Sequence, residues 1–334
     1  MQNSLRRAVR KGPFLAKSVV VVGAETLLGR DVREVLEATH LDISLRLLNT
    51  EEETEGAMIT REDDELVTME RLSANSLEGA DVVILATKAV KAAKLVKKKI
   101  QLIDLTASIP ATVVAPMVTG PKPIKGAIAI AHPAAIALGL LLARLPSVPV
   151  RAVVEVFEPA SERGKEGIDE MQQQTINLLS FKPLPQKVFD TQATLNLLAA
   201  YGDEAPRSLA QVEEQIVEHL GKLLGGGRVP SLRVLHAPVF HGVMISAWLE
   251  FSGPVTRKEL EKSLANELVD IRGNDVELPT NVGVAGQTGI TVSITEDRQN
   301  SQAFWFWVGG DNLRLVSENV MVVLTSLFGR GRVN

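Results

Sequence analysis

The sequence predicts an α/β protein with an N-terminal Rossmann-type parallel-sheet domain and a C-terminal α+β domain. Strand and helix patterns alternate from Ser18 onward, and the strands are continuous apolar runs, which is typical of parallel sheets covered on both faces. After Pro133 the strands become longer and more amphipathic, which favours an antiparallel sheet with helices on one face. At 334 residues the chain is long for one core, and its 45% hydrophobic content supplies apolar surface for two.

The first domain is expected to be a dinucleotide-binding domain over 18–132. Its predicted strands are SVVVVGA, DISLRLLN, ADVVILAT and IQLIDLT, and its helices are TLLGRDVREVLEAT and KAVKAAKLVKKK. A polar, acidic stretch from Glu51 to Glu65 follows the second predicted strand. An apolar helix within 312–334 is expected to pack back on this domain and complete it, whereas residues 1–17 predict a flexible basic arm.

The second domain is expected over 133–311. Its predicted strands are VRAVVEVFEP, SLRVLHAPVF, GVMISAWLEF, TGITVSITED and QAFWFWVGG. Between them lie the helical patterns SERGKEGIDEMQQQTINLLS and SLAQVEEQIVEHLGKLL. The strands VRAVVEVF and QAFWFWV carry more apolar faces than a lone two-layer domain needs, which favours a homodimer through this sheet.

Composition and charge exclude several classes of function. With 36 basic and 40 acidic residues the net charge is −4, so we expect no nucleic-acid partner and favour a small-molecule ligand or a protein partner. No apolar run is long enough to span a membrane, and we expect a cytoplasmic protein. The absence of cysteine excludes disulfides, thiolate metal sites and cysteine nucleophiles, and no metal site is predicted.

A glycine-containing turn follows the first predicted strand. Gly23 and Gly29 of VVVVGAETLLGR occupy two of the three positions of a dinucleotide-binding motif, at the start of a helix that could hold a pyrophosphate. The middle position is Thr26, whose side chain we expect in the space of a phosphate. The turn therefore indicates either a dinucleotide site or a strand–helix junction that needs glycine for geometry alone.

Acidic residues follow the second predicted strand, where dinucleotide folds bind the adenine ribose. Glu51 and Glu52 would accept a hydrogen bond from the ribose 2′-hydroxyl of NAD and repel the 2′-phosphate of NADP. NAD is therefore allowed and NADP disfavoured. A solvated acidic loop with no cofactor is the alternative.

The segment GAIAIAHPAAIALG has the shape of a nucleophile site but lacks a nucleophile. It predicts a buried strand, a turn at Pro133 and an apolar helix, a place where α/β enzymes often carry a nucleophile. It contains no Ser, Thr or Cys.

An ordered set of motifs resembles the aspartate-semialdehyde dehydrogenases. The segments are VGAETLLGRDVREVLE, DVVILATKAVKAA, LIDLTAS, AIAHPAAIAL, EVFEPASERGKEGIDEMQQQT, APVFHG and AFWFWVGGDNLR. The resemblance implies a fold of the semialdehyde dehydrogenase and glyceraldehyde-3-phosphate dehydrogenase-like type. It also implies a homodimer that uses NADP, a thioester on a cysteine, a histidine acid/base and substrate-binding arginines.

Those functional positions are changed in this chain. The resemblance places Ala135 at the cysteine, Glu158 at a glutamine and Val243 at the acid/base histidine. It places His236 and Pro110 at the two arginines. The cofactor positions that the motifs imply are Gly23, Thr26, Gly29, Glu51, Thr87 and Asn312.

Two functional hypotheses follow. The first is a member of this family that has lost the thioester reaction and has a binding or regulatory role. The second is a different NAD-dependent oxidoreductase, or a hydrolase, that uses His132, His236, His241 or Glu158 near the old cleft. The alternative for each of these histidines is that it has no catalytic role and is simply packed in the core or exposed on the surface. The usual thioester dehydrogenase reaction is excluded because no cysteine is present.

Overall fold

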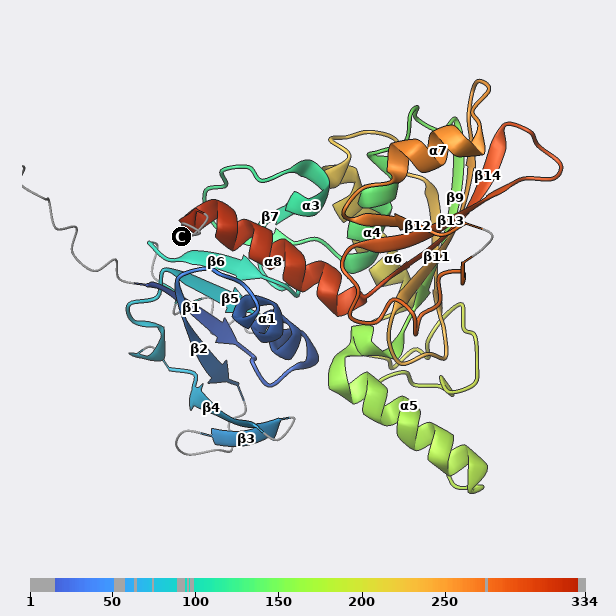
Figure 1. Ribbon diagram of the computed structural model, residues 1–334. Coiled ribbons are helices and arrows are strands. Elements are labelled where there is room, and N and C mark those ends of the chain that lie inside the picture. The colour runs from blue at the N-terminus through green and yellow to red at the C-terminus, as the bar shows by residue number, and fades with distance from the viewer. Residues whose placement is uncertain are drawn as a thin grey trace, which may run out of the picture.

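The structure is a computed structural model with two sheet-containing regions joined by helices α4 and α8 (Figure 1). It describes residues 16–50, 58–62, 65–73, 75–88, 94, 96, 99–273 and 276–329. The predicted arm, except for its last two residues, and the predicted acidic site at Glu51 and Glu52 lie outside these ranges. So does most of the predicted helix KAVKAAKLVKKK.

The first sheet confirms the predicted Rossmann-type domain. Its strands, in the described part of the chain, follow the order β3-β4-β2-β1-β5-β6-β8-β7, and every neighbouring pair except β3 with β4 is parallel. The strands are β1 (Lys17–Val22), β2 (Ile43–Asn49), β3 (Met58–Glu62), β4 (Glu65–Arg71), β5 (Val82–Leu85), β6 (Gln101–Asp104), β7 (Thr112–Val114) and β8 (Ile128–Ile130).

Strand β1 runs through the middle of this sheet and is buried on both faces. Val19 and Val21 belong to one apolar cluster, and Val20 and Val22 belong to another on the opposite face. This division follows from the two-residue period of a strand. It explains why the predicted pattern is a continuous run of valine.

The polar stretch that ends at Glu65 carries no predicted strand, but β3 and β4 form an antiparallel pair at the edge of the sheet. An edge pair can tolerate charged residues that no central strand would carry, so its polar sequence resembles that of a loop.

The last helix of the chain packs on the first domain. The helical segments of that domain are α1 (Leu27–Glu37), η1 (Asn75–Leu77) and α3 (Pro116–Thr119). Helix α4 (Pro133–Leu142) follows β8, and α8 (Asn312–Phe328) is the last helix of the described chain. Figure 1 shows α8 lying beside α1. Arg314 of α8 bonds to Asp31 at 3.3 Å and to Glu34 at 2.6 Å. Helix α8 therefore packs on the first domain although it follows the second in sequence.

The second sheet is mixed, which corrects the antiparallel expectation. Its strand order is β10-β9-β11-β14-β13-β12 among the described residues, and the pairs β9–β10 and β12–β13 are parallel. The strands are β9 (Arg151–Glu158), β10 (Ser231–His236), β11 (Val243–Glu250), β12 (Val269–Ile271), β13 (Ile290–Glu296) and β14 (Ala303–Gly310). The helical segments are η2 (Ala160–Arg163), α5 (Gly164–Leu179), α6 (Leu209–Leu223) and α7 (Arg257–Leu264).

The two faces of this sheet differ in burial. Val154 and Val156 of β9 are buried against the core, whereas Val153 points the other way and is 43% exposed. Trp305 of β14 is 44% exposed. The sheet therefore presents apolar side chains on the face away from the helical core. No helix in the described part of the chain is long and apolar enough to cross a membrane.

Candidate functional site

The predicted glycine turn joins β1 to α1 and requires both of its glycines. Gly23 has a φ of 81°, and a Cβ atom there would lie 2.6 Å from Cγ2 of Thr87. A Cβ atom on Gly29 would lie 2.2 Å from the carbonyl oxygen of Gly23. Both contacts are shorter than van der Waals packing allows, so a side chain at either position would displace the turn.

Thr26 caps α1 instead of filling the turn. Its hydroxyl accepts from the N–H of Gly29 at 3.0 Å and donates to the carbonyl oxygen of Gly23 at 2.8 Å. The N–H groups of Leu27 and Leu28 have no acceptor among the residues that the structure describes. The expectation that this side chain blocks a phosphate is therefore wrong, because it is turned back on the loop and leaves N–H groups available to an anion.

A carboxylate that the motif analysis missed lies at the end of β2. Glu25 Oε1 accepts from the hydroxyl of Thr50 at 2.8 Å, directly after the last residue of that strand. Thr50 directly precedes the predicted site residue Glu51, which lies outside the described residues. The sequence does show that Glu25 is an acidic residue two positions after Gly23. Its spacing from Gly23 does not reveal that its side chain points toward the end of β2.

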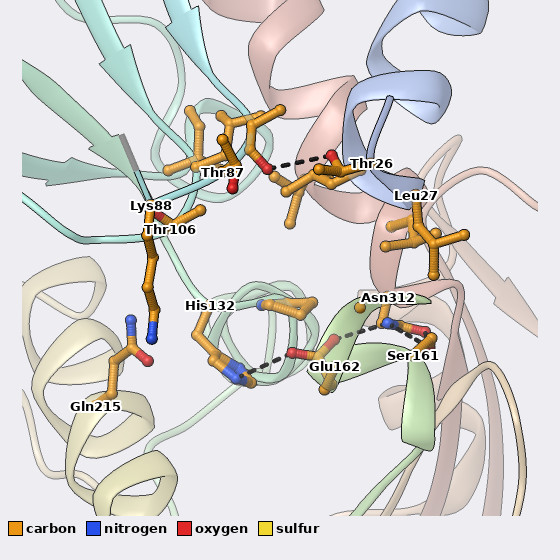
Figure 2. A pocket seen from close by; sticks show the side chains of 18 of the residues that line it. Thr26, Leu27, Thr87, Lys88, Thr106, His132, Ser161, Glu162, Gln215 and Asn312 are labelled. Atoms are coloured by element: carbon orange, nitrogen blue, oxygen red, sulfur yellow. Dashed lines mark hydrogen bonds and ion pairs between the residues drawn. The ribbon is translucent and has the colours of Figure 1, made fainter. Parts of the chain in front are cut away.

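One cavity of about 260 Å³ extends from the start of α1 to the start of α4 (Figure 2). It contains the predicted cofactor positions Thr26, Thr87 and Asn312 together with His132. Its other lining residues include Leu27, Leu28, Lys88, Thr106, Pro133, Ser161, Glu162, Arg207 and Gln215. In the described ranges, no group of three or more His, Asp or Glu side chains is placed to hold a metal ion.

The segment that lacks a nucleophile forms β8 and the start of α4. His132 is the N-cap residue, Pro133 follows in the first turn, and Ala135 is completely buried. A proline suits this first turn because its missing N–H has no partner there in any helix. Ala135, which the resemblance aligns with the family's cysteine, therefore contributes only a buried methyl group.

His132 is held as one neutral tautomer. Its Nδ1 atom accepts from the N–H of Ala134 at 3.2 Å, so the ring proton is on Nε2. Its own backbone N–H donates to Nδ1 of His219 at 2.9 Å. Burial, with Arg207 nearby, holds the pKa of His132 well below its usual range. The ring therefore stays uncharged at neutral pH.

Glu162 is a site residue that the sequence reasoning missed. Its Oε2 atom lies 3.4 Å from Nε2 of His132, and its Oε1 atom accepts from the side-chain amide of Asn312 at 2.7 Å (Figure 2). Burial and the charge of Glu158 raise the pKa of Glu162 to about 7. The carboxyl group therefore changes its charge near neutral pH.

Glu158 and His236 do not line the cavity, so the prediction that they occupy the cleft is wrong. Glu158 is buried and pairs with Arg163 at 2.8 Å. His236 is fully buried, with Nδ1 3.1 Å from the hydroxyl of Tyr201 and Nε2 3.2 Å from the carbonyl oxygen of Ala193. Both residues end adjacent, paired strands, β9 and β10, and their side chains are used in packing beneath the site.

His241 and Val243 also lie outside the cavity lining. Nε2 of His241 bonds to Asp311 at 2.9 Å, and Nδ1 lies 3.2 Å from the hydroxyl of Ser161. Burial alone would lower the pKa of His241, but the hydrogen bond and charge of Asp311 outweigh it and raise this pKa. Val243 is buried at the first position of β11. His241 therefore belongs to a network at the start of α8.

These environments predict distinct titrations for the histidines. Burial lowers the pKa of His219 and of His236 to about 4, whereas the pKa of His241 is raised. NMR titration of the imidazole C–H signals should show that the rings of His219 and His236 remain neutral until about pH 4 and that His241 titrates above its usual value. The ring of His132 should also titrate well below its usual value. His236 and His219 should also make the protein less stable as the pH falls from 6.5 to 4, because only the unfolded state is protonated in that window. Titration of His236 near its unperturbed value would contradict the buried placement.

The chain matches the family model described as "Semialdehyde dehydrogenase, dimerisation domain" over residues 141–315. It is 32% identical over 168 residues to the aspartate-semialdehyde dehydrogenase of Rickettsia bellii, which covers 49% of this chain and 50% of that protein. It is 30% identical over 207 residues to a USG-1 protein homolog of Azotobacter vinelandii, covering 59% of this chain and 60% of that protein. The chain thus spans about half the length of the first of these curated relatives.

A solved structure supports the fold over more of the chain. It is entitled a probable aspartate-semialdehyde dehydrogenase from Pseudomonas aeruginosa, and it superposes with a TM-score of 0.78 at 23% identity. The superposition covers 94% of this chain and 98% of that one. By the family match across its second domain, the chain belongs to the semialdehyde dehydrogenase family.

Proposed function

We propose that this chain does not carry out a thioester-based dehydrogenase reaction and that its retained cleft has a binding or regulatory role. The observation that carries the proposal is the buried methyl group of Ala135 at the start of α4. The sequence has no cysteine anywhere, so no other segment can supply the thiolate. Serine or threonine would give an oxygen ester, which is a much poorer acceptor of hydride than a thioester.

The cleft nevertheless keeps the features that bind a nucleotide. The Gly23 turn is intact, and the N–H groups of Leu27 and Leu28 are available at the start of α1. Glu25 places a carboxylate at the end of β2, which supports NAD over NADP because a 2′-phosphate would meet a like charge. We infer that NAD, if any cofactor, occupies this turn and that a small molecule occupies the part beside His132.

A second candidate function is a different NAD-dependent oxidoreductase or a hydrolase on the same scaffold. The observation that favours a remaining activity is that His132 and Glu162 face one another in the cavity. His236 and His241 give it less support, because neither side chain lines the cavity. His236 is bonded to Tyr201 and Ala193, and both ring nitrogens of His241 are taken up by Asp311 and Ser161.

We also propose that the protein is a cytoplasmic homodimer. The family model matched by the second domain is a dimerisation domain, and Val153 and Trp305 are partly exposed on the open face of its sheet. The absence of cysteine is compatible with a reducing compartment.

A turnover assay tests the loss of the family reaction. With aspartate semialdehyde, phosphate and NADP, we expect no turnover above buffer. The double variant Ala135→Cys, Val243→His should recover little activity, because Glu158, His236 and Pro110 still replace other functional groups. Robust turnover by the unmodified protein would refute the proposal, and full recovery by the double variant would show that the remaining positions were assigned wrongly.

Calorimetric titration with NAD, NADH, NADP and NADPH tests the cofactor site. We expect the non-phosphorylated pair to bind more tightly, because the Glu25 carboxylate beside Thr50 would repel a 2′-phosphate bound at the end of β2. Glu25→Gln should reduce the preference, and Glu37→Gln on the other end of α1 is the matched control. Tight binding of NADP by the unmodified protein would reverse the assignment, and no binding of any of the four would leave the glycine turn with a structural role only.

Analytical sedimentation at micromolar concentration tests the dimer. The unmodified protein should sediment as a dimer, and Trp305→Glu should shift it toward the monomer because a charge would be placed on the apolar face. A monomer at that concentration would contradict the proposed assembly. Val217→Glu, on the exposed side of α6, provides a control for the effect of an added charge.

A further inference from the structure

Beyond nucleotide binding, the cavity brings together a hydrogen-bond donor (His132), a carboxyl group (Glu162) and a cation (Arg207). We propose that His132 and Glu162 form a proton-transfer site that acts on the carbon next to the carbonyl group of a small anionic ligand. This inference rests on the proposed function in one respect, because it requires the cleft to bind a small molecule. It requires neither a cysteine nor a nucleotide.

His132 has the geometry of a neutral group that polarises a carbonyl. Its side chain is 6% exposed, and its Nε2 atom has no hydrogen-bond partner among the described residues. The N–H of Ala134 occupies Nδ1, which keeps the proton on Nε2 and opposes protonation of the ring. A neutral imidazole at a helix N-terminus polarises the substrate carbonyl in a well-understood isomerase reaction in the same way.

Glu162 is placed to act as the base. One carboxyl oxygen is anchored by Asn312, and the other lies 3.4 Å from Nε2 of His132, so the two groups are adjacent in the cavity wall (Figure 2). A carbonyl oxygen bound to Nε2 would therefore place its neighbouring carbon close to the free carboxyl oxygen. The other charged groups that act on Glu162 are Glu158, Arg163 and Arg207, and their effects, with burial, leave its pKa at about 7. Such a value suits a base that works near neutral pH.

Arg207 can hold the anionic group of the ligand. It lines the cavity and donates to the side chain of Gln215, but no carboxylate of the described chain lies within ion-pair distance of it. Arg163 differs, because it is already paired with Glu158 at 2.8 Å. Figure 2 shows Lys88 extending toward Gln215, and Lys88 is a second cation that lines the cavity. The ligand that fits is a carboxylate or phosphate with a nearby carbonyl group.

The reaction balances without a redox partner. The C–H bond next to the carbonyl breaks, and its proton moves to the Glu162 carboxylate. The electron pair forms a carbon–carbon double bond while the carbonyl oxygen gains negative charge, which the Nε2–H of His132 stabilises. Return of a proton from Glu162 to carbon restores a carbonyl compound, and in D₂O the returning atom is a deuteron.

Deuterium exchange tests this site directly. The full-length protein would be incubated in D₂O with pyruvate or with dihydroxyacetone phosphate, and loss of the proton next to the carbonyl would be followed by ¹H NMR against buffer alone. We expect exchange above buffer that increases as the pH rises through about 7. Exchange of pyruvate alone would identify a carboxylate ligand, and exchange of dihydroxyacetone phosphate alone would identify a phosphate ligand.

Three variants isolate the two residues. Glu162→Gln should slow exchange by about 100-fold or more, because it removes the base and keeps the shape. His132→Asn should slow it by about 100-fold, because asparagine can still cap α4 but has no proton donor at the position of Nε2. Glu166→Gln, an exposed neighbour in α5, should exchange like the unmodified protein. Thermal unfolding of each variant shows whether it is folded, and Glu162→Gln decides the test if His132→Asn is not.

The outcomes separate this inference from the proposed function. Calorimetric binding of either probe without exchange by the unmodified protein would overturn the proton-transfer site and leave the binding role intact. Exchange that Glu162→Gln and His132→Asn do not slow would overturn it as well. If neither probe binds or exchanges, the proposed ligand class is wrong, whereas the nucleotide titration still tests the cofactor turn independently.

Discussion

The geometry of the cleft depends on the side-chain amide of Asn312. Its nitrogen donates to Ser161 at 3.0 Å and to Glu162 at 2.7 Å, and its oxygen accepts from the N–H of Gly242 at 3.1 Å. The residue is almost completely buried, so leaving any of these groups unpaired would be costly. Because Asn312 begins α8, which packs on α1 of the first domain, the same amide links η2 and Gly242, the residue before β11, to that helix. The cavity wall formed by Ser161, Glu162 and Asn312 is therefore held by hydrogen bonds of the Asn312 amide, and Ala135 has no part in them.

This arrangement explains how the scaffold can persist without cysteine. The other walls come from backbone features, namely the positive φ of Gly23, the cap that Thr26 provides and the proline at the start of α4. Ala135 packs its methyl group into the apolar surroundings of α4, where it leaves no buried polar atom unsatisfied. The proposed proton-transfer site depends on two other groups in the cavity, the neutral ring of His132 and the carboxyl group of Glu162.

The sequence was most informative where a local rule decides the structure. The valine run of β1 and the glycine at position 23 follow from burial on two faces and from a backbone conformation that few residues adopt, so both could be predicted. The strands β3 and β4 could not, because an edge pair with polar residues has no apolar pattern. Glu158 and His236 were wrongly predicted to lie in the cleft because each ends a strand that leads toward it. Their side chains instead contact Arg163 and Tyr201 and do not line the cavity. Glu162 was missed for the opposite reason: within SERGKE it resembles a solvated helix charge, and only the approach of α8 and α4 buries it.

The central claim is that one cavity contains both the glycine turn, which would hold a nucleotide, and a ligand site formed by His132 and Glu162. The most direct test is a crystal structure of the protein grown with NADH. The account predicts the pyrophosphate against the N–H groups of Leu27 and Leu28, and the nicotinamide in the cavity with His132 and Glu162. A structure in which the cavity is closed by its own side chains, or in which the nucleotide binds elsewhere, would contradict it.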